Sequence, residues 1–122
     1  MLGATKMKPT TKLRQMLAGE GPLLVPGAYD GASARAVYGQ GHEAVYLTGF
    51  GMEASILGMP DIGLASQAEI IGHARRIAAA VPMPVLSDAD TGYGGLINVH
   101  RTGIEFERAG IAGIHIEDQA LP

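Results

Sequence analysis

The chain contains no cysteine among its 122 residues, which excludes disulfide bonds and thiolate metal sites within these residues. No apolar run approaches the length that spans a membrane, and no apolar signal-peptide core follows the start. Neither sign of charge dominates, since the formal net charge is -3. This mildly acidic balance gives no reason to propose nucleic acid or an anionic membrane as a partner.

What the chain does contain is enough apolar material for one modest domain with a core, because 47% of its residues are hydrophobic. Its 18 glycines lie singly between apolar runs, so the sequence is not of low complexity. Residues 1–19 have four basic side chains and no acid. A transit peptide has this composition, but the simpler interpretation is a frayed start followed by a short helix with Leu13, Met16 and Leu17 on one face. A cytoplasmic enzyme or binding domain is the default expectation.

The pattern of apolar residues predicts strands alternating with helices. Strands are expected at residues 23–25, 44–47, 85–87 and 113–116.

Ser66 and Glu69 form a capping box, which predicts the start of a helix with an apolar stripe of Ile70, Ile71, Ala74, Ile77 and Ala78. Asn98 is the expected N-cap of a second helix, whose inner face is Val99, Gly103, Phe106 and Ala109. A weaker helix is expected from Gly31 to Tyr38, and residues 49–65 are expected to include an irregular loop. This alternation predicts an α/β fold with a parallel sheet.

Polar side chains follow the ends of the expected strands. They are Tyr29 and Asp30, Thr48, Asp88 and Asp90, and Glu117 and Asp118. In parallel α/β folds, ligands bind beyond the carboxyl ends of the strands. The sequence therefore predicts a cleft at this edge of the sheet. His115 and Glu117 are expected to share one face of their strand, and Ile114 and Ile116 the other.

Four carboxylates from this edge suggest a divalent metal site. Asp88, Asp90 and Glu117 follow strands, and Asp61 lies in the segment "GMPDIG". Two unit charges about 5 Å apart repel by roughly 3 kcal/mol at an effective dielectric constant near 20, so such a group needs a cation or shared protons. Oxygen ligands suit Mg²⁺ or Mn²⁺. The alternative is turn formation, before Gly92 for the first two residues and as a Pro-Asp turn for Asp61.

Other motifs are weaker. Residues 49–54 match the dinucleotide pattern G-x-G-x-x-A, but the acidic residue that should end the next strand falls on Glu69, inside a helix cap. Residues 88–92 imitate the start of a calcium loop, whose twelfth position should be Glu and is Val99. His115, Tyr46 and Thr48 either line the cleft or simply pack. The other histidines, His42, His73 and His100, are placed in a turn or on helix surfaces.

The segments "YLTGFG", "LGMPDIG", "SDADTGYGG" and "GIHIEDQ", in this order and spacing, resemble the isocitrate lyase/phosphoenolpyruvate mutase superfamily. The resemblance runs from Val25 to Pro122 and implies a (β/α)₈ TIM barrel, usually tetrameric, that binds Mg²⁺ and an α-oxyacid. It implies that Asp88 is the direct metal ligand, while Asp61, Asp90 and Glu117 hold metal-bound waters. It also implies that Tyr46, Thr48, Gly49 and Phe50 grip the substrate carboxylate, and that His115 lines the site.

The resemblance further implies that residues 20–122 are the first part of a barrel, with about four of its eight strands, and that residues 1–19 form an extension. Phe50 adds bulk where methylisocitrate lyases commonly have glycine. The loop whose cysteine is the acid of the lyases would follow beyond Pro122. The expected function is Mg²⁺-dependent (Mn²⁺ is possible) carbon–carbon cleavage of a di- or tricarboxylate 2-hydroxy acid similar to 2-methylisocitrate, releasing pyruvate or a related oxoacid. Oxaloacetate decarboxylase, a phosphonopyruvate mutase or hydrolase, an inactive fragment and a nucleotide-binding module are the alternatives, and the chain alone is expected to be inactive.

Overall fold

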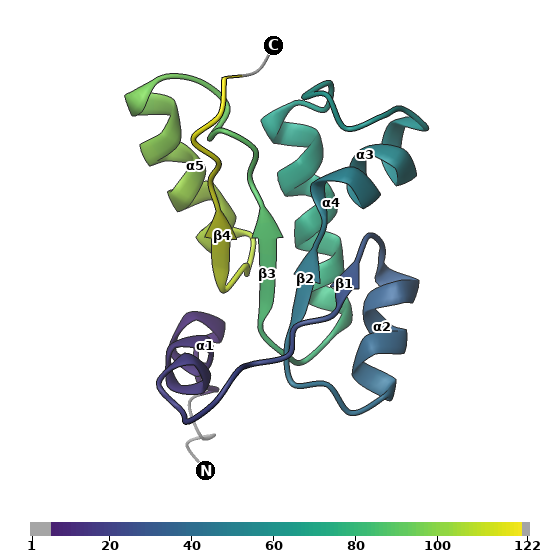
Figure 1. Cartoon of the computed structure of the whole chain (residues 1–122), viewed down its shortest axis with the longest axis vertical. Coiled ribbons are helices and arrows are strands. Elements are labelled where there is room, and N and C mark those ends of the chain that lie inside the picture. The colour runs from purple at the N-terminus through teal and green to yellow at the C-terminus, as the bar shows by residue number, and fades with distance from the viewer. Residues whose placement is uncertain (1–5, 121–122) are drawn as a thin grey trace.

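The computed structural model describes residues 6–120, which form a four-stranded sheet and five helices (Figure 1). The elements, in chain order, are α1 (Pro9–Leu17), β1 (Gly27–Ala28), α2 (Gly31–Gly39), β2 (Val45–Leu47), α3 (Gly49–Leu57), α4 (Gln67–Ala80), β3 (Val85–Asp88), α5 (Leu96–Arg108) and β4 (Gly113–His115). The predicted alternation of strands and helices is therefore confirmed.

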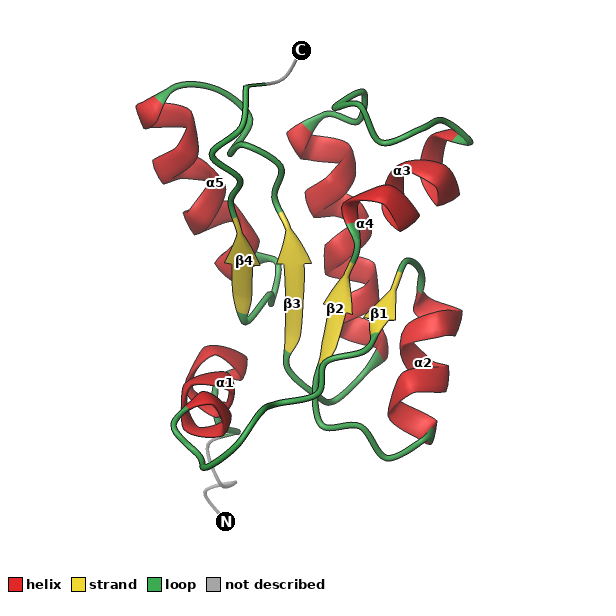
Figure 2. Cartoon of the chain, viewed as in Figure 1, coloured by secondary structure: helices red, strands yellow, loops and turns green. Residues whose placement is uncertain are grey.

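The four strands are parallel and lie in chain order, β1-β2-β3-β4. All four arrows in Figure 2 point toward the same edge, where α3 and the loop that follows β3 lie. The register pairs Tyr46 with Leu86 and Asp88 with His115. Because side chains alternate between the two faces of a strand, these pairings determine which residues share a face of the sheet.

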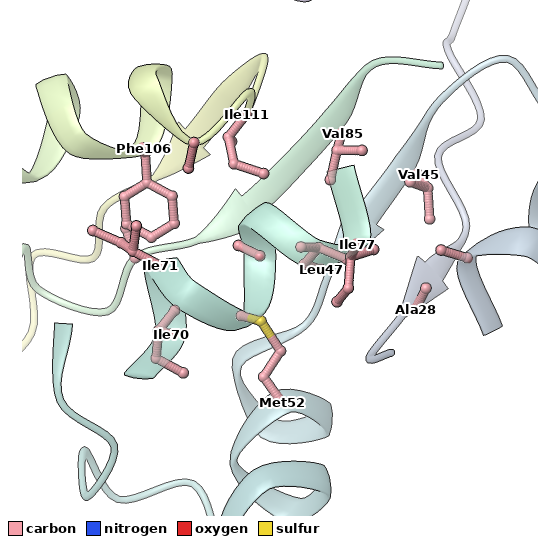
Figure 3. Packing of buried hydrophobic residues seen from close by; sticks show 14 of the residues in the cluster. Ala28, Val45, Leu47, Met52, Ile70, Ile71, Ile77, Val85, Phe106 and Ile111 are labelled. Atoms are coloured by element: carbon pink, nitrogen blue, oxygen red, sulfur yellow. The ribbon is translucent and has the colours of Figure 1, made fainter. Parts of the chain in front are cut away.

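The core lies between one face of the sheet and the helices that connect its strands (Figure 3). Val45, Leu47 and Val85 point from the sheet into this layer, and Ile77 of α4 and Phe106 of α5 pack against them as members of the same buried cluster. The opposite face of the sheet is less covered, since Tyr46, Leu86 and Asp88 are only partly buried. The fold therefore has one closed face and one face available to a ligand.

The predicted capping box at the start of α4 is confirmed. The Ser66 side chain accepts from the Glu69 backbone N–H, and the Glu69 carboxylate accepts from the Ser66 backbone N–H at 2.8 Å. The predicted stripe on this helix is buried at Ile70, Ile71 and Ala74, and also at Ile77, with Ala78 half-buried. The helix predicted from Gly31 to Tyr38 is α2, and α1 is the short helix expected before residue 20. On α1 only Leu13 is buried, while Leu17 is 63% exposed; the expected fraying at residues 1–5 lies outside the described residues.

The strand predicted at residues 23–25 is wrong. This segment is irregular, and β1 comprises Gly27 and Ala28 instead. Pro22 and Pro26 flank the predicted strand, and proline has no N–H to give to a ladder. Pairing begins only where the Pro26 carbonyl accepts from the Tyr46 N–H at 2.9 Å.

The expectation of an irregular loop over residues 49–65 is wrong for its first half, which forms α3. Thr48 is the N-cap of this helix, since its Oγ1 accepts from the Gly51 N–H at 2.9 Å, and Gly58 ends the helix at φ 64°. A capping threonine and a left-handed glycine with nine residues between them are ordinary helix boundaries, so the signal was present in the sequence.

Asn98 is not the N-cap of α5. The helix begins at Leu96 with Gly95 as its N-cap, and Asn98 lies inside its first turn. The predicted inner face is confirmed at Phe106 and Ala109, which are buried; Thr102 is buried beside them, while Val99 and Gly103 are half-buried. Among the described residues, no helix is long and apolar enough to cross a membrane.

Candidate functional site

The site is built on the open face of the sheet, at the carboxyl ends of β2, β3 and β4. Asp88 is the last residue of β3 and pairs with His115, the last residue of β4. Glu117 follows β4 and is tied to the loop after β3, because its backbone N–H donates to the Asp90 carbonyl at 2.7 Å. The predicted juxtaposition of the polar residues after β3 and β4 is therefore present.

The Asp88 carboxylate lies against the first residue of α3. A Cβ added to Gly49 would be only 2.3 Å from Asp88 Oδ2, so this approach requires glycine. The N–H groups of the first helical turn have no carbonyl one turn earlier in the helix, and the helix dipole favours negative charge there. The start of α3 is therefore a place where an anionic group is stabilised by backbone N–H donors.

The loop after β3 holds Asp90 in an uncommon backbone conformation. Asp90 has φ 46° and Tyr93 has φ 62°, which is the left-handed region that few residues other than glycine adopt. The Asp90 N–H donates to Asp88 Oδ1 at 3.0 Å, and the Gly92 N–H donates to the Ala89 carbonyl at 2.9 Å. This tight turn brings two carboxylates together and orients one of them.

The acidic side chains lie within electrostatic reach of one another. Burial raises the pKa of Asp90 to about 6, and the charges of Asp88 and Asp61 add to the shift, followed by those of Glu53 and Glu117. Burial, with Glu53, Asp88 and Glu117, also raises the pKa of Asp61. These shifts mean that negative charge at the site is destabilised when no cation is present.

Tyr46 and His115 face each other across the site. The His115 Nδ1 and the Tyr46 hydroxyl are hydrogen bonded at 3.2 Å, and the ring centroids are 5.1 Å apart. Burial raises the pKa of Tyr46 to about 12, with the charges of Asp88 and Glu117 contributing. The tyrosine therefore stays protonated at neutral pH and is able to donate a hydrogen bond.

Phe50 and Thr48 line a neighbouring pocket of about 370 Å³. Its other lining residues are Tyr29, Gly51, Ala54 and Ser55. Phe50 is 64% exposed, and the backbone that precedes α2 is fixed beside the pocket because His73 Nε2 donates to the Tyr29 carbonyl at 2.7 Å. The sequence placed His73 on a helix surface, and in the structure its ring also forms this hydrogen bond to the backbone before α2.

The donor set fits a hard cation held largely through water. In residues 6–120, no three His, Asp or Glu side chains come close enough together to hold a metal ion by themselves. Mg²⁺ does not need such a group, since it commonly binds one or two carboxylates and keeps several waters. Asp88 would be the direct ligand, with Asp61, Asp90 and Glu117 as acceptors for bound waters. The raised pKa values of Asp61 and Asp90 agree with a site that a cation completes.

Sequence reasoning missed one acidic residue of this region, Glu53. It lies on α3, is 1% exposed, and contributes its charge to the raised pKa values of Asp61 and Asp90. Because the segment was expected to be an irregular loop, this glutamate gave no sign of being buried. The cap at Thr48 was a signal for the helix that contains Glu53, but not for the burial of this side chain.

Comparison with known proteins agrees with this geometry. The family model described as phosphoenolpyruvate phosphomutase matches residues 13–121. The 2,3-dimethylmalate lyase of Eubacterium barkeri is 43% identical over 116 residues, which is 95% of this chain and 40% of that protein.

Two solved structures extend the comparison. The crystal structure of oxaloacetate acetylhydrolase matches with a TM-score of 0.90 and 42% identity, over 93% of this chain and 41% of that one. Phosphonopyruvate hydrolase in complex with oxalate and Mg²⁺ matches with a TM-score of 0.89 and 29% identity, over 95% of this chain and 41% of that one. This chain therefore spans about 40% of the length of the relatives it matches, and it belongs to the phosphoenolpyruvate mutase/isocitrate lyase superfamily.

Proposed function

We propose that these residues are the first two fifths of a (β/α)₈ barrel enzyme that cleaves a carbon–carbon bond of a 2-hydroxy acid and depends on Mg²⁺, or on Mn²⁺ in its place. The products are pyruvate or a related oxoacid and a second carboxylic acid. The observation that supports this most is the Asp88 carboxylate, which lies against the first turn of α3 and whose charge, after burial, adds to the raised pKa values of Asp61 and Asp90. Such a site is suited to a cation and an anionic substrate together.

The chain's own residues would bind and orient the substrate carboxylate. The backbone N–H groups of Gly49 and Phe50 belong to the first turn of α3, where no intrahelical carbonyl accepts from them. Thr48 uses its oxygen as an acceptor for Gly51, so its hydroxyl proton is left to donate to a ligand. Held by these donors, the bond to be cleaved has one orientation relative to Asp88.

Charge at the reacting oxygen is the second requirement. A bound Mg²⁺ would supply positive charge that stabilises the negative charge developing on a substrate oxygen. The protonated Tyr46 adds a hydrogen-bond donor at the same edge of the sheet, and His115 orients it through the 3.2 Å contact. The resemblance of the "IEDQ" segment to the superfamily implies that the acid that protonates the departing carbon lies on a loop that would follow Pro122.

A second candidate is cleavage of oxaloacetate by water. It is favoured by the likeness to oxaloacetate acetylhydrolase, one structure of which contains the product oxalate. Both functions would use the carboxylate-binding turn at the start of α3, and they differ in their products. Oxaloacetate and water give oxalate and acetate, while cleavage of the 2-hydroxy acid gives an oxoacid and a second carboxylic acid.

The test is a product assay on the complete protein with Mg²⁺. 2-Methylisocitrate, 2,3-dimethylmalate and oxaloacetate are each supplied, and pyruvate, other oxoacids and oxalate are measured separately. Release of an oxoacid from one of the hydroxy acids supports the lyase, and oxalate from oxaloacetate supports the hydrolase. The variant Asp88→Ala should lose detectable metal-dependent turnover, and unchanged activity would contradict the role given to Asp88.

A further inference from the structure

Glu53 is a charged residue in the core whose burial the site has not yet explained. Its side chain is 1% exposed. Among residues 6–120, the other polar residues that are buried are Ser87 and Thr102. A buried carboxylate is costly unless hydrogen bonds satisfy its oxygens. The partners of Glu53 therefore indicate what its burial achieves.

Both carboxylate oxygens of Glu53 accept from the backbone of the loop between α3 and α4. Oε1 accepts from the Ala65 N–H at 2.8 Å, and Oε2 accepts from the Ile62 N–H at 3.3 Å. The donors lie nine and twelve residues further along the chain, so the two bonds attach the returning loop to α3. Hydrogen bonds in which backbone N–H groups donate to a charged carboxylate are among the stronger ones in proteins.

Asp61 lies one residue before the Ile62 attachment point. Its side chain is largely exposed, and partial burial, followed by the charges of Glu53, Asp88 and Glu117, raises its pKa. The hydrogen bond from the Ile62 N–H to Glu53 fixes the backbone directly after Asp61.

We infer that Glu53 is a positioning residue, whose two hydrogen bonds to the Ile62 and Ala65 N–H groups hold Asp61 at the metal-water shell of the site. This inference rests on the proposed cation site, and it adds a residue that contacts neither metal nor substrate. Outer-shell partners of this kind are worth roughly 10- to 100-fold in metal affinity.

The test compares Glu53→Gln with wild type in the complete protein, using Mn²⁺ as the probe. In the variant one oxygen is still able to accept from Ala65, but the amide NH₂ faces the Ile62 N–H and that bond is lost. Two quantities are measured: the dissociation constant for Mn²⁺ by electron paramagnetic resonance, and the amide hydrogen exchange of residues 58–66 without metal. We expect Mn²⁺ to bind roughly 10-fold more weakly and exchange across the loop to be faster.

A double-mutant cycle separates positioning from a purely structural role. Asp61→Asn should weaken Mn²⁺ binding in wild type and have little further effect in the Glu53→Gln background, because Asp61 has then already left its place. The matched control is Glu69→Gln, which also removes a carboxylate that accepts a backbone N–H, from Ser66 at 2.8 Å, but away from Asp61. It should leave Mn²⁺ affinity unchanged.

The outcomes distinguish this inference from the proposed function. If wild type binds Mn²⁺ but Glu53→Gln binds it equally well, or if the two substitutions weaken binding independently, Glu53 serves stability alone and the inference is overturned. Unchanged loop exchange in Glu53→Gln also overturns it. If wild type binds no Mn²⁺, the cation site and with it the proposed function fail, while the exchange measurement still decides whether Glu53 holds the loop.

Discussion

At the scale of single residues, the site depends on how closely Asp88 approaches the start of α3. Only a glycine at position 49 leaves room for the carboxylate, because an added Cβ would be 2.3 Å from Asp88 Oδ2. The same glycine leaves the backbone N–H groups open to an anionic ligand. One position thus determines both the direction of the Asp88 carboxylate, the proposed metal ligand, and the access to the backbone donors.

The substitution Gly49→Ala tests this contact. We expect the Asp88 carboxylate to be displaced and Mn²⁺ affinity of the complete protein to fall roughly 10-fold or more, measured by calorimetry. Gly103→Ala is the control, since nothing lies within 4 Å of a Cβ at that position in α5. It should leave the affinity unchanged and stabilise the helix by about 1 kcal/mol. Equal affinities for wild type and Gly49→Ala would show that the approach is unimportant.

Asp30 makes a pH-dependent contribution to stability. It is the N-cap of α2, and hydrogen bonds from the backbone and side chain of Ser33 lower the pKa of its carboxyl below the ordinary value of 3.8. A lowered pKa means that the unfolded state binds the proton more readily, so the stabilisation is present above 3.8 and is lost as pH falls through the folded value.

The variant Asp30→Asn keeps a capping oxygen and removes the charge. We expect it to be less stable than wild type at pH 6, with a difference that narrows as the pH falls below 3.8, the ordinary value of this carboxyl. Urea denaturation of the complete protein at several pH values measures the difference. A gap that stays constant or widens in acid would contradict the assigned cause.

At the scale of the elements, helices α4 and α5 hold the strand ends in place through the core. Phe106 of α5 is 1% exposed and packs within the cluster that includes Ile71 of α4 (Figure 3). Its ring therefore connects α5, which follows β3, with α4, which precedes β3. Thr102, one turn earlier, donates its hydroxyl to the Gly92 carbonyl at 2.8 Å and so fixes the loop that contains Asp90.

We expect Phe106→Ala to destabilise the complete protein by about 3–5 kcal/mol, because it leaves a cavity in the core. The comparison is Ile104→Ala on the same helix, where the side chain is 37% exposed and the loss should be much smaller. Chemical denaturation measures both. Losses of similar size would mean that the ring is not part of a tightly packed core.

The sequence predicted the elements well where hydrophobic period and caps agreed, as at Ser66 and Glu69. The prediction of a strand between Pro22 and Pro26 failed because the prolines at the ends of this apolar segment have no N–H to donate to a sheet. The prediction also failed for α3, because its apolar residues do not repeat with a helical period on one side. The carboxylates after β3 and β4 were predictable because parallel strands end at one edge. Glu53 was not, since its burial depends on a loop that returns nine to twelve residues later.

At the scale of the whole molecule, the sheet is a piece of a closed architecture. β1 and β4 are the outer strands of the described sheet, and one face of it has no helix layer (Figure 2). Open edges of this kind invite pairing with other chains. The relatives are longer proteins, and about 60% of their length lies outside the part that this chain matches. The tetramer that the resemblance implies stays a prediction.

We therefore expect the 122-residue chain alone to associate or aggregate and to show no turnover, and we expect the complete protein to stay in solution and to turn over substrate. Size-exclusion chromatography and the product assay, run on both proteins at matched concentration, check this. A monomeric, active 122-residue chain would show that the missing strands are not needed.

The central claim is that carboxylates from separate strand ends gather around one hard cation. The most direct test is a crystal structure of the complete protein with Mn²⁺ and oxalate, in which anomalous scattering locates the metal. We predict one Mn²⁺ in direct contact with the Asp88 carboxylate, with bound waters reaching Asp61, Asp90 and Glu117, and with oxalate facing the first turn of α3. A metal bound elsewhere, or none near Asp88, would contradict the account.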